Sequence, residues 1–237
     1  MLPVLKTEHH SFCTGKLAKG CELCVEGRKL VLFVTGVCGQ RCFYCPISEH
    51  KFGHDVVYAN EWKIADPENP VELIEEARLT DATGAGITGG DPLANTERTC
   101  KYIKLLKKEF GNAFHIHLYT PLQRVNEARL KQLHDAGLDE IRFHPDLDDS
   151  RWWDRISLAK KFNWSEGIEI PAIPNYEAKT KTLIDFIKDK VSFINLNELE
   201  LSDTTAKHYK LNERYRPKDN VSYGVKGSKE MALEILP

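Results

Sequence analysis

Short apolar runs alternate with amphipathic segments along most of this chain, and that alternation limits the fold more than any other feature. The first run, KLVLFVTG at 29–36, is rich in Val, Leu and Phe, which is typical of a buried strand. No hairpin turn signal separates the runs, so the pattern predicts parallel strands joined by right-handed crossovers. Further strands are predicted at 84–90, 114–120, 140–145, 167–174 and 191–201, and helices at 70–80, 95–110, 125–137, 148–162 and 177–190.

This order of elements fits either an open doubly wound sheet or a partial barrel. The first strand is not followed by G-x-G-x-x-G, which weakens the dinucleotide-binding form of the open sheet. We therefore predict an α/β fold, a partial (β/α)6 TIM-like barrel at 29–201, preceded by a cysteine-rich N-terminal extension at 1–28. A polar tail at 202–237 ends in a short helix that Ser228 is expected to cap. In such barrels the chemistry collects at the carboxyl ends of the strands.

Composition disfavours several classes of partner. The formal net charge of -2 provides no basic field, so neither nucleic acid nor an anionic membrane is an expected partner. No apolar run approaches the roughly 20 residues that are needed to cross a bilayer. The first residues lack the apolar core of a secretion signal, so the expected location is the cytoplasm. Because thiols stay reduced there, the seven cysteines indicate metal or redox chemistry rather than disulfides.

Three of these cysteines, Cys38, Cys42 and Cys45, lie in one loop directly after the first predicted strand. Three thiolates so placed can each bind one iron of a [4Fe–4S] cluster and leave the fourth iron without a protein ligand. A metal site with an open position is typical of catalysis, whereas closed sites are structural. The spacing therefore predicts a catalytic iron–sulfur cluster. The alternative is that the three cysteines form part of a zinc site.

A second group, Cys13, Cys21 and Cys24, precedes that strand. Its C-x2-C spacing suits one metal, because two thiolates in a tight turn reach the same ion. A second iron–sulfur cluster, an iron or a zinc is expected here, and ordinary buried thiols are the alternative. The remaining cysteine, Cys100, lies in an amphipathic segment and is expected to be a small core residue. The fourth ligand of the metal expected at Cys13, Cys21 and Cys24 is left open among His9, His10, Cys100 and residues outside this chain.

Two motifs together carry a resemblance to a known family. CGQRCFYC at 38–45 resembles the C-x3-C-x2-C signature of the radical S-adenosylmethionine (SAM) enzymes, including members like the pyruvate formate-lyase activating enzyme. GGDP at 89–92 is similar to the Gly-Gly-Glu-Pro segment of that family, with Asp in place of Glu. The resemblance covers residues 30–201 and implies a [4Fe–4S] cluster, SAM, and a 5′-deoxyadenosyl radical that takes hydrogen from an unidentified substrate.

The resemblance and the strand pattern also suggest residues for SAM. Arg142 and His144 are two apart in a strand and share one face, so they are candidates for the SAM carboxylate and ribose. The polar face of a half-exposed strand would look the same. Asn195 and Asn197 share a face of the last strand. They are candidates for contact with the ribose or the substrate, and closing the open edge of the barrel is the alternative role. The resemblance implies further SAM-binding positions at Tyr44, Gly89, Gly90, Asp91, Pro92 and Ile170.

In these SAM positions the two glycines are expected to let the backbone approach the methionyl group, with Tyr44 and Ile170 beside the adenine. The resemblance also implies a reductant protein such as a ferredoxin or flavodoxin. Two other hypotheses remain, namely an iron–sulfur electron carrier and a zinc-bound regulatory module, both without radical chemistry. The GGDP segment argues against a carrier, because a carrier needs no pocket for an organic cofactor. The substrate is left open among a partner enzyme that receives a glycyl radical, a peptide or RNA, and a small molecule or lipid.

Overall fold

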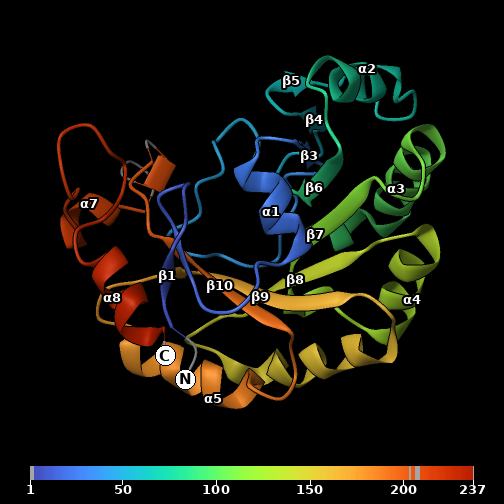
Figure 1. Cartoon of the computed structure of the whole chain (residues 1–237). Helices are drawn as coiled ribbons and strands as arrows, with labels where there is room; N and C mark the ends of the chain where they lie inside the picture. The colour runs from blue at the N-terminus through green and yellow to red at the C-terminus, as the bar shows by residue number, and fades with distance from the viewer. Residues whose placement is uncertain (1–2, 203, 206–208, 237) are drawn as a thin grey trace.

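The structure, a computed structural model, describes residues 3–202, 204–205 and 209–236. Within these residues, the core is a sheet in which six strands run parallel (Figure 1). Strands β3 and β10 lie at opposite ends of this parallel set and do not pair, so the barrel is open on one side. In sheet order the parallel strands are β3 (Lys29–Phe33), β6 (Gly84–Thr88), β7 (His115–Pro121), β8 (Glu140–His144), β9 (Ser165–Ala172) and β10 (Phe193–Glu198).

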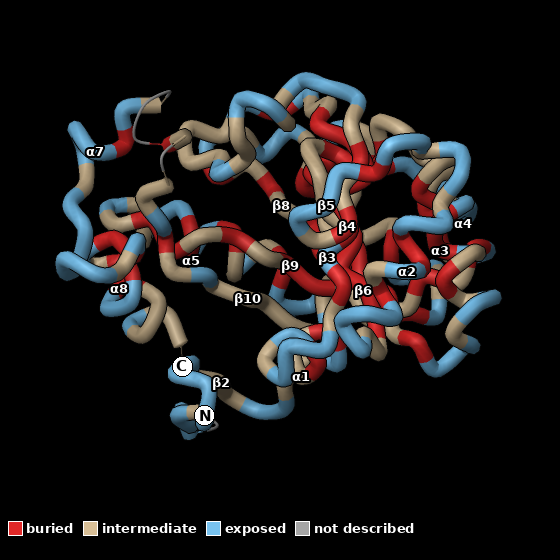
Figure 2. The backbone as a smooth tube through the Cα atoms, turned by 90° about the horizontal axis from the view of Figure 1, so that it is seen from above, coloured by how far each residue is buried: buried red, intermediate tan, exposed pale blue. Residues whose placement is uncertain are grey.

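Helical segments connect successive strands and cover the outer face of the sheet (Figure 1). Alternate strand residues such as Leu30, Ile116 and Ile141 are fully buried, and the buried residues run along the strands (Figure 2). The predicted α/β partial barrel is therefore confirmed. No helix among the described residues is long and apolar enough to span a membrane. The covering segments are α2 (Val71–Leu79), α3 (Thr96–Phe110), α4 (Glu127–Ala136), η3 (Ser150–Lys161) and α5 (Glu177–Ile187).

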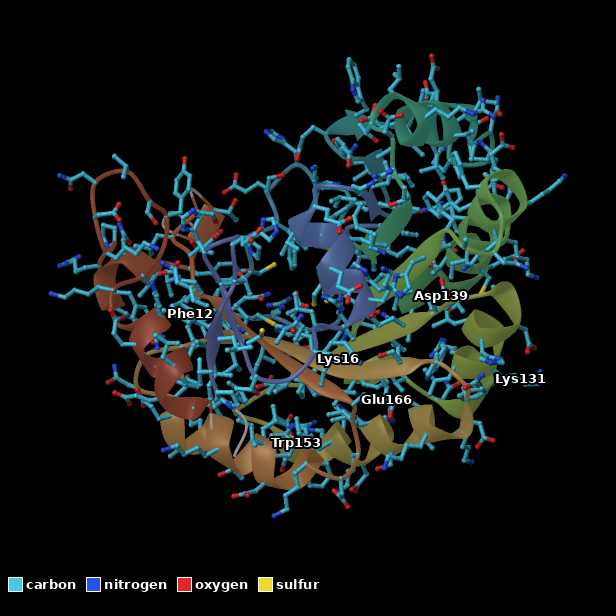
Figure 3. All side chains as sticks on the ribbon, in the orientation of Figure 1. Phe12, Lys16, Lys131, Asp139, Trp153 and Glu166 are labelled. Atoms are coloured by element: carbon cyan, nitrogen blue, oxygen red, sulfur yellow. The ribbon has the colours of Figure 1, made fainter. Side chains whose placement is uncertain are left out.

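Two segments differ from the prediction. The helix expected at 148–162 is the 3-10 helix η3, and its buried residues Trp153, Ile156 and Ala159 are spaced three apart. That spacing matches the three residues per turn of a 3-10 helix, so the tighter winding keeps all three on the buried side. Trp153 packs between η3 and α5, with its ring 5.5 Å from that of Phe186 (Figure 3). After the cysteine loop, a short hairpin that the apolar pattern did not predict, β4 (Tyr58–Ala59) and β5 (Trp62–Lys63), pairs with β3.

The tail ends in α8 (Ser228–Ile235), as expected, but Ser228 does not cap it. The cap position is Gly227, whose φ of 88° suits glycine. The Ser228 hydroxyl instead donates to the carbonyl of Ala172 at 2.6 Å and accepts from the amide of Leu199 at 2.8 Å. Ser228 therefore joins the end of β9 to the chain that leaves β10.

The N-terminal extension packs against the barrel. It forms β1 (Leu5–Lys6), β2 (Phe12–Cys13) and α1 (Lys19–Val25), and α1 contacts β6 and β7. The amide of Gly20 donates to Glu140 Oε2 at 3.1 Å, and the Lys229 ammonium of α8 lies over the Phe12 ring (Figure 3). The extension thus lies in the opening of the partial barrel, between β3 and β10 (Figure 1).

A charge network formed by Glu140, Arg142 and Glu169 lies on β8 and β9. Arg142, 2% exposed, donates to Glu140 at 2.6 Å and to Glu169 at 2.7 Å. Burial disfavours the charged guanidinium, but nearby anions outweigh it and raise the pKa of Arg142. Because two carboxylates face one guanidinium, the cost of burying these charges is offset by pairing.

Two histidines, the buried His117 and the partly buried His115, lie beside this network. Burial, and then the charge of Lys29, lowers the pKa of His115 to about 4, so its 3.7 Å approach to Glu140 is not an ion pair at neutral pH. Burial and Arg142 lower the pKa of His117 well below its usual value. Both imidazoles are therefore neutral in the folded chain at neutral pH.

These histidines predict that the chain is less stable in mild acid. Above pH 6.5 both are neutral in the folded and unfolded states, whereas below it the unfolded chain binds more protons. The free energy of unfolding should therefore fall as the pH drops from 6.5 toward 4, by about 1 kcal/mol per histidine per pH unit. Urea titrations at pH 7.5, 6.5 and 5.5 measure this fall. His117→Gln should flatten the pH dependence and His134→Gln, on α4, should not; equal slopes would contradict the prediction.

Gly20 predicts a second effect on stability. A Cβ there would lie 2.5 Å from Arg142 Nη2 and 2.7 Å from His117 Nδ1, within a network that cannot shift freely. Gly20→Ala should lower the free energy of unfolding by about 1–3 kcal/mol, the usual cost of overpacking. Lys19→Ala, which removes only an exposed ion pair with Glu22, is the matched control and should cost less than about 1 kcal/mol. Equal urea midpoints for Gly20→Ala and wild type would refute the packing argument.

Candidate active site

A cavity of about 730 Å³, here called the central cavity, lies at the carboxyl ends of the strands. Its wall combines the loop after β3, the turn after β6 and the ends of β7 to β10. The sequence-predicted residues that line it are the thiols of Cys38, Cys42 and Cys45, together with Tyr44, Gly89, Gly90, His144, Ile170 and Asn197. Residues from six strands or the loops after them therefore meet at one hollow, as expected for a barrel of this kind.

The cysteine loop supplies thiols of the right type for iron. Burial raises the pKa of Cys38 to about 11 and the pKa of Cys42 to about 12, so both are protonated at neutral pH. A metal that binds them must displace these protons. Among the described residues, no three His, Cys, Asp or Glu side chains are already arranged as a metal site. The loop therefore provides donors and proximity rather than a preset coordination geometry.

The glycine turn after β6 holds the start of this loop. The amide of Gly90 donates to the carbonyl of Thr35 at 2.7 Å, and the amide of Asp91 donates to that of Val37 at 2.9 Å. A Cβ at Gly89 would lie 2.5 Å from the Thr35 oxygen, and one at Gly90 would lie 2.6 Å from that of Val37. The close approach that demands glycine here is between two protein segments, which sequence reasoning did not predict.

Asp91 and Pro92 do not line the central cavity. The Asp91 carboxylate, 1% exposed, accepts from the Leu93 amide at 3.0 Å and from the Thr120 hydroxyl at 2.9 Å, and its second oxygen lies 3.3 Å from Arg124. It thereby caps η1 (Pro92–Asn95). Burial raises the pKa of Asp91. A contact between Asp91 and SAM stays a prediction.

Tyr44 and His144 bind each other at the cavity wall. The Tyr44 hydroxyl lies 2.9 Å from His144 Nε2, and His144 Nδ1 lies 2.8 Å from the carbonyl oxygen of Glu169. Burial lowers the pKa of His144, so the imidazole is neutral. The Cys42 thiol also lies beside the Tyr44 hydroxyl, and this contact offsets part of the burial-driven rise in the pKa of Cys42.

Glu169, which sequence reasoning missed, joins the cavity to the charge network. Its carboxylate lines the cavity and accepts from Arg142 at 2.7 Å, Asn195 at 2.9 Å and Asn197 at 2.9 Å. Arg142 and Asn195 themselves do not line the cavity. A charged residue inside the apolar run GIEIPAIP was the available signal, because a carboxylate in a buried strand needs partners.

The second cysteine group is only partly brought together. Cys21 and Cys24 lie one turn apart on α1, whereas Cys13 is on β2. The Cys21 sulfur accepts from Arg142 at 3.3 Å and from Asn195 at 3.1 Å, so it lies against the charge network. A second metal at these cysteines stays a prediction. Cys100 is partly buried against the core, as its helical position suggests.

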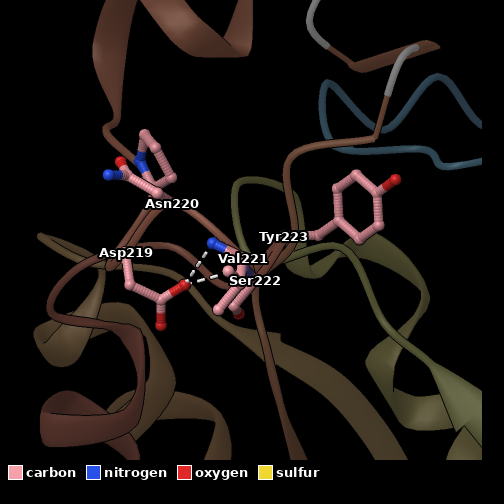
Figure 4. Close-up of a pocket in the computed structure, with 6 residues that line it drawn as sticks. Asp219, Asn220, Val221, Ser222 and Tyr223 are labelled. Atoms are coloured by element: carbon pink, nitrogen blue, oxygen red, sulfur yellow. Dashed lines mark hydrogen bonds between the residues drawn. The ribbon is translucent and has the colours of Figure 1, made fainter.

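A second hollow, of about 440 Å³, lies in the tail between Pro217 and Tyr223 (Figure 4). There Asp219 accepts from the amides of Val221 at 2.9 Å and Ser222 at 2.7 Å, which forms a local turn. Its lining brings together no thiol, histidine or cation, so we assign the chemistry to the central cavity.

The glycine turn generates a prediction about iron binding. Gly90→Ala should push the carbonyls of Gly36 and Val37 away and displace the cysteine loop, because backbone atoms cannot rotate aside. We expect fewer iron atoms per chain after anaerobic reconstitution and a stability loss of about 1–3 kcal/mol. Gly111→Ala, at an open position with φ of 84°, should cost stability through backbone strain and leave iron content unchanged. Equal iron content in the two variants would contradict this role.

Comparisons with known proteins agree with this geometry. The family model of the Radical SAM superfamily matches residues 32–187. A Methanocaldococcus jannaschii protein, provisionally named glycyl-radical enzyme activating enzyme MJ0021, is 46% identical over 231 residues. The match covers 93% of this chain and 60% of that protein, so the chain spans less than two thirds of the length of that relative.

Two solved structures share the fold at low identity. The radical SAM methyltransferase TsrM from Kitasatospora setae, with tryptophan and a SAM analogue bound, has a TM-score of 0.54 at 13% identity, covering 86% of this chain and 44% of its own. Methylornithine synthase (PylB) has a TM-score of 0.54 at 16% identity, covering 83% of this chain and 60% of its own. With the family match over most of the barrel, the comparisons show that this chain is an enzyme of the radical SAM superfamily.

Proposed function

We propose that this chain cleaves SAM reductively and uses the resulting 5′-deoxyadenosyl radical to take hydrogen from a substrate. The observation that carries the proposal is the meeting of three cysteine thiols and a glycine turn at one cavity. Both segments follow neighbouring parallel strands, β3 and β6, so the fold itself brings them together.

The donor set fits a [4Fe–4S] cluster. Cys38, Cys42 and Cys45 would hold three irons, and no further thiol lines the cavity among the described residues, which leaves a position for SAM. When bound and reduced, such a cluster supplies the electron that breaks the sulfonium C–S bond. The chain's own residues bind the two groups, orient them and exclude water.

The cavity also suits SAM by size and charge. Its volume of about 730 Å³ lies within the usual range for small-molecule sites. The charged side chains that line it among the described residues are the carboxylates of Glu169, Glu198 and Glu200, and SAM carries a sulfonium and an ammonium. Apolar wall residues such as Ile170 and Leu196 give the adenine an apolar surface and limit access of water.

For the substrate we propose a glycine residue of a partner enzyme, because the M. jannaschii relative is named for glycyl-radical activation. A reductant such as a ferredoxin or flavodoxin would deliver the electron. Thiol-held iron and free cysteines need a reducing compartment, which supports the cytoplasm as the location. A second metal at Cys13, Cys21 and Cys24 belongs to the same proposal, supported by the C-x2-C spacing.

Anaerobic reconstitution tests the proposal. The wild type should become brown and form 5′-deoxyadenosine from SAM after reduction with dithionite. Replacing Cys38, Cys42 or Cys45 by Ala should lower this product by more than about 100-fold, because loss of a direct ligand exceeds the ~10–100-fold cost of outer-shell changes. Cys100→Ala, outside the cavity, is the matched control and should keep the activity.

Two outcomes would favour the alternatives. A brown, redox-active protein that is inert toward SAM would indicate an electron carrier. A colourless protein that retains zinc would indicate a regulatory module. Transfer of hydrogen label from a glycine of a partner enzyme into 5′-deoxyadenosine would identify the substrate class.

A further inference from the structure

We propose that His144 is a positioning residue that fixes the cysteine loop through the hydroxyl of Tyr44. The importance of this tether for radical chemistry rests on the function proposed above, whereas the tether itself concerns only the protein. Sequence reasoning assigned both side chains to the cofactor, but in the structure they bind each other at 2.9 Å.

The hydrogen-bond directions follow from the acceptors. A backbone carbonyl can only accept, so His144 Nδ1 carries a proton and donates to the Glu169 oxygen at 2.8 Å. In the neutral imidazole this leaves Nε2 as an acceptor, and Tyr44 is the donor to it at 2.9 Å. The hydrogen bonds from Tyr44 to His144 and from His144 to Glu169 thus connect the loop to β8 and β9.

The position of Tyr44 makes this link relevant to the thiols. Tyr44 is adjacent to Cys45 and two residues from Cys42, so holding its side chain restricts both. The ring of the neighbouring Phe43 packs against that of Tyr176, with 6.0 Å between the ring centroids. This contact lacks the directionality of a hydrogen bond. The hydroxyl of Tyr44 is therefore the polar anchor of this part of the loop.

The anchor on the barrel is itself rigid. His144 closes β8, and the Glu169 carbonyl belongs to β9, which is paired with both β8 and β10. The Glu169 side chain is held by Arg142, Asn195 and Asn197. A site gains precision when its ligands are oriented by groups on regular elements. The geometry points to a loop whose path along the barrel is held at Tyr44 before iron arrives, while the thiols are drawn together only by the metal.

The test measures thiol exposure in the full chain without bound iron. Tyr44→Phe, which keeps the ring, His144→Ala and the double variant are treated with iodoacetamide, and alkylation of each cysteine is followed by mass spectrometry. Cys100 serves as an internal reference for global unfolding. Tyr102→Phe removes another buried hydroxyl, which donates to the Pro67 carbonyl at 2.9 Å, and is the matched control.

Loss of the tether should speed alkylation of Cys42 and Cys45 by about fivefold in both single variants, the factor expected for one net hydrogen bond. At Cys45 the double variant should match the single ones, because both remove the same link. In reconstituted protein, iron release to a chelator should be faster in Tyr44→Phe than in Tyr102→Phe.

Unchanged rates at Cys42 and Cys45 in Tyr44→Phe would overturn the proposal. Equal acceleration at Cys100 would also overturn it, because that pattern reports general destabilisation. Neither readout involves SAM cleavage. A wild type that forms no 5′-deoxyadenosine would refute the proposed function while selective alkylation still supported the tether.

Discussion

The site depends on one short set of backbone hydrogen bonds, which join the glycine turn after β6 to the first residues of the cysteine loop. The loop leaves β3 without regular secondary structure, and these bonds hold its first residues against the end of β6. Parallel pairing of β3 with β6 brings the two segments into reach, and two missing Cβ atoms let them touch. The glycines serve protein contact first, and they shape the cavity wall as a result.

A second constraint is electrostatic. The lumen of a six-stranded partial barrel is too polar here to be a hydrophobic core, so its charges must be matched internally. Arg142 lies between Glu140 and Glu169 and donates to both. The side-chain amides of Asn195 and Asn197 also donate to the Glu169 carboxylate. Glu169 and Asn197 belong both to this network and to the lining of the central cavity. The same residues therefore pair the charges inside the barrel and shape the wall of the site.

The sequence was informative where local pattern decides structure. Apolar periodicity located the parallel strands and the helices between them, and cysteine spacing located the loop that lines the cavity. The 3-10 winding of η3 was visible only as the three-residue spacing of Trp153, Ile156 and Ala159, a signal that a search for the 3.6 period overlooks.

Contacts between strands could not be predicted in this way. Glu169 meets Asn195 because of the register between β9 and β10, and Tyr44 meets His144 across 100 residues of sequence. Likewise, the docking of α1 in the barrel opening depends on Gly20 reaching Glu140. A single sequence does not specify register or the partner of a polar group, so residue roles assigned by strand alternation alone were incomplete.

The docking of α1 also has a consequence for biosynthesis. Gly20 contacts a residue 120 positions later, and Cys21 contacts one 174 positions later. A ribosome releases the amino-terminal residues first, so these early cysteines leave the exit tunnel well before the strands that will cover them. During that interval the nascent chain carries these thiols uncovered, so they are open to oxidation until β8 and β10 have formed.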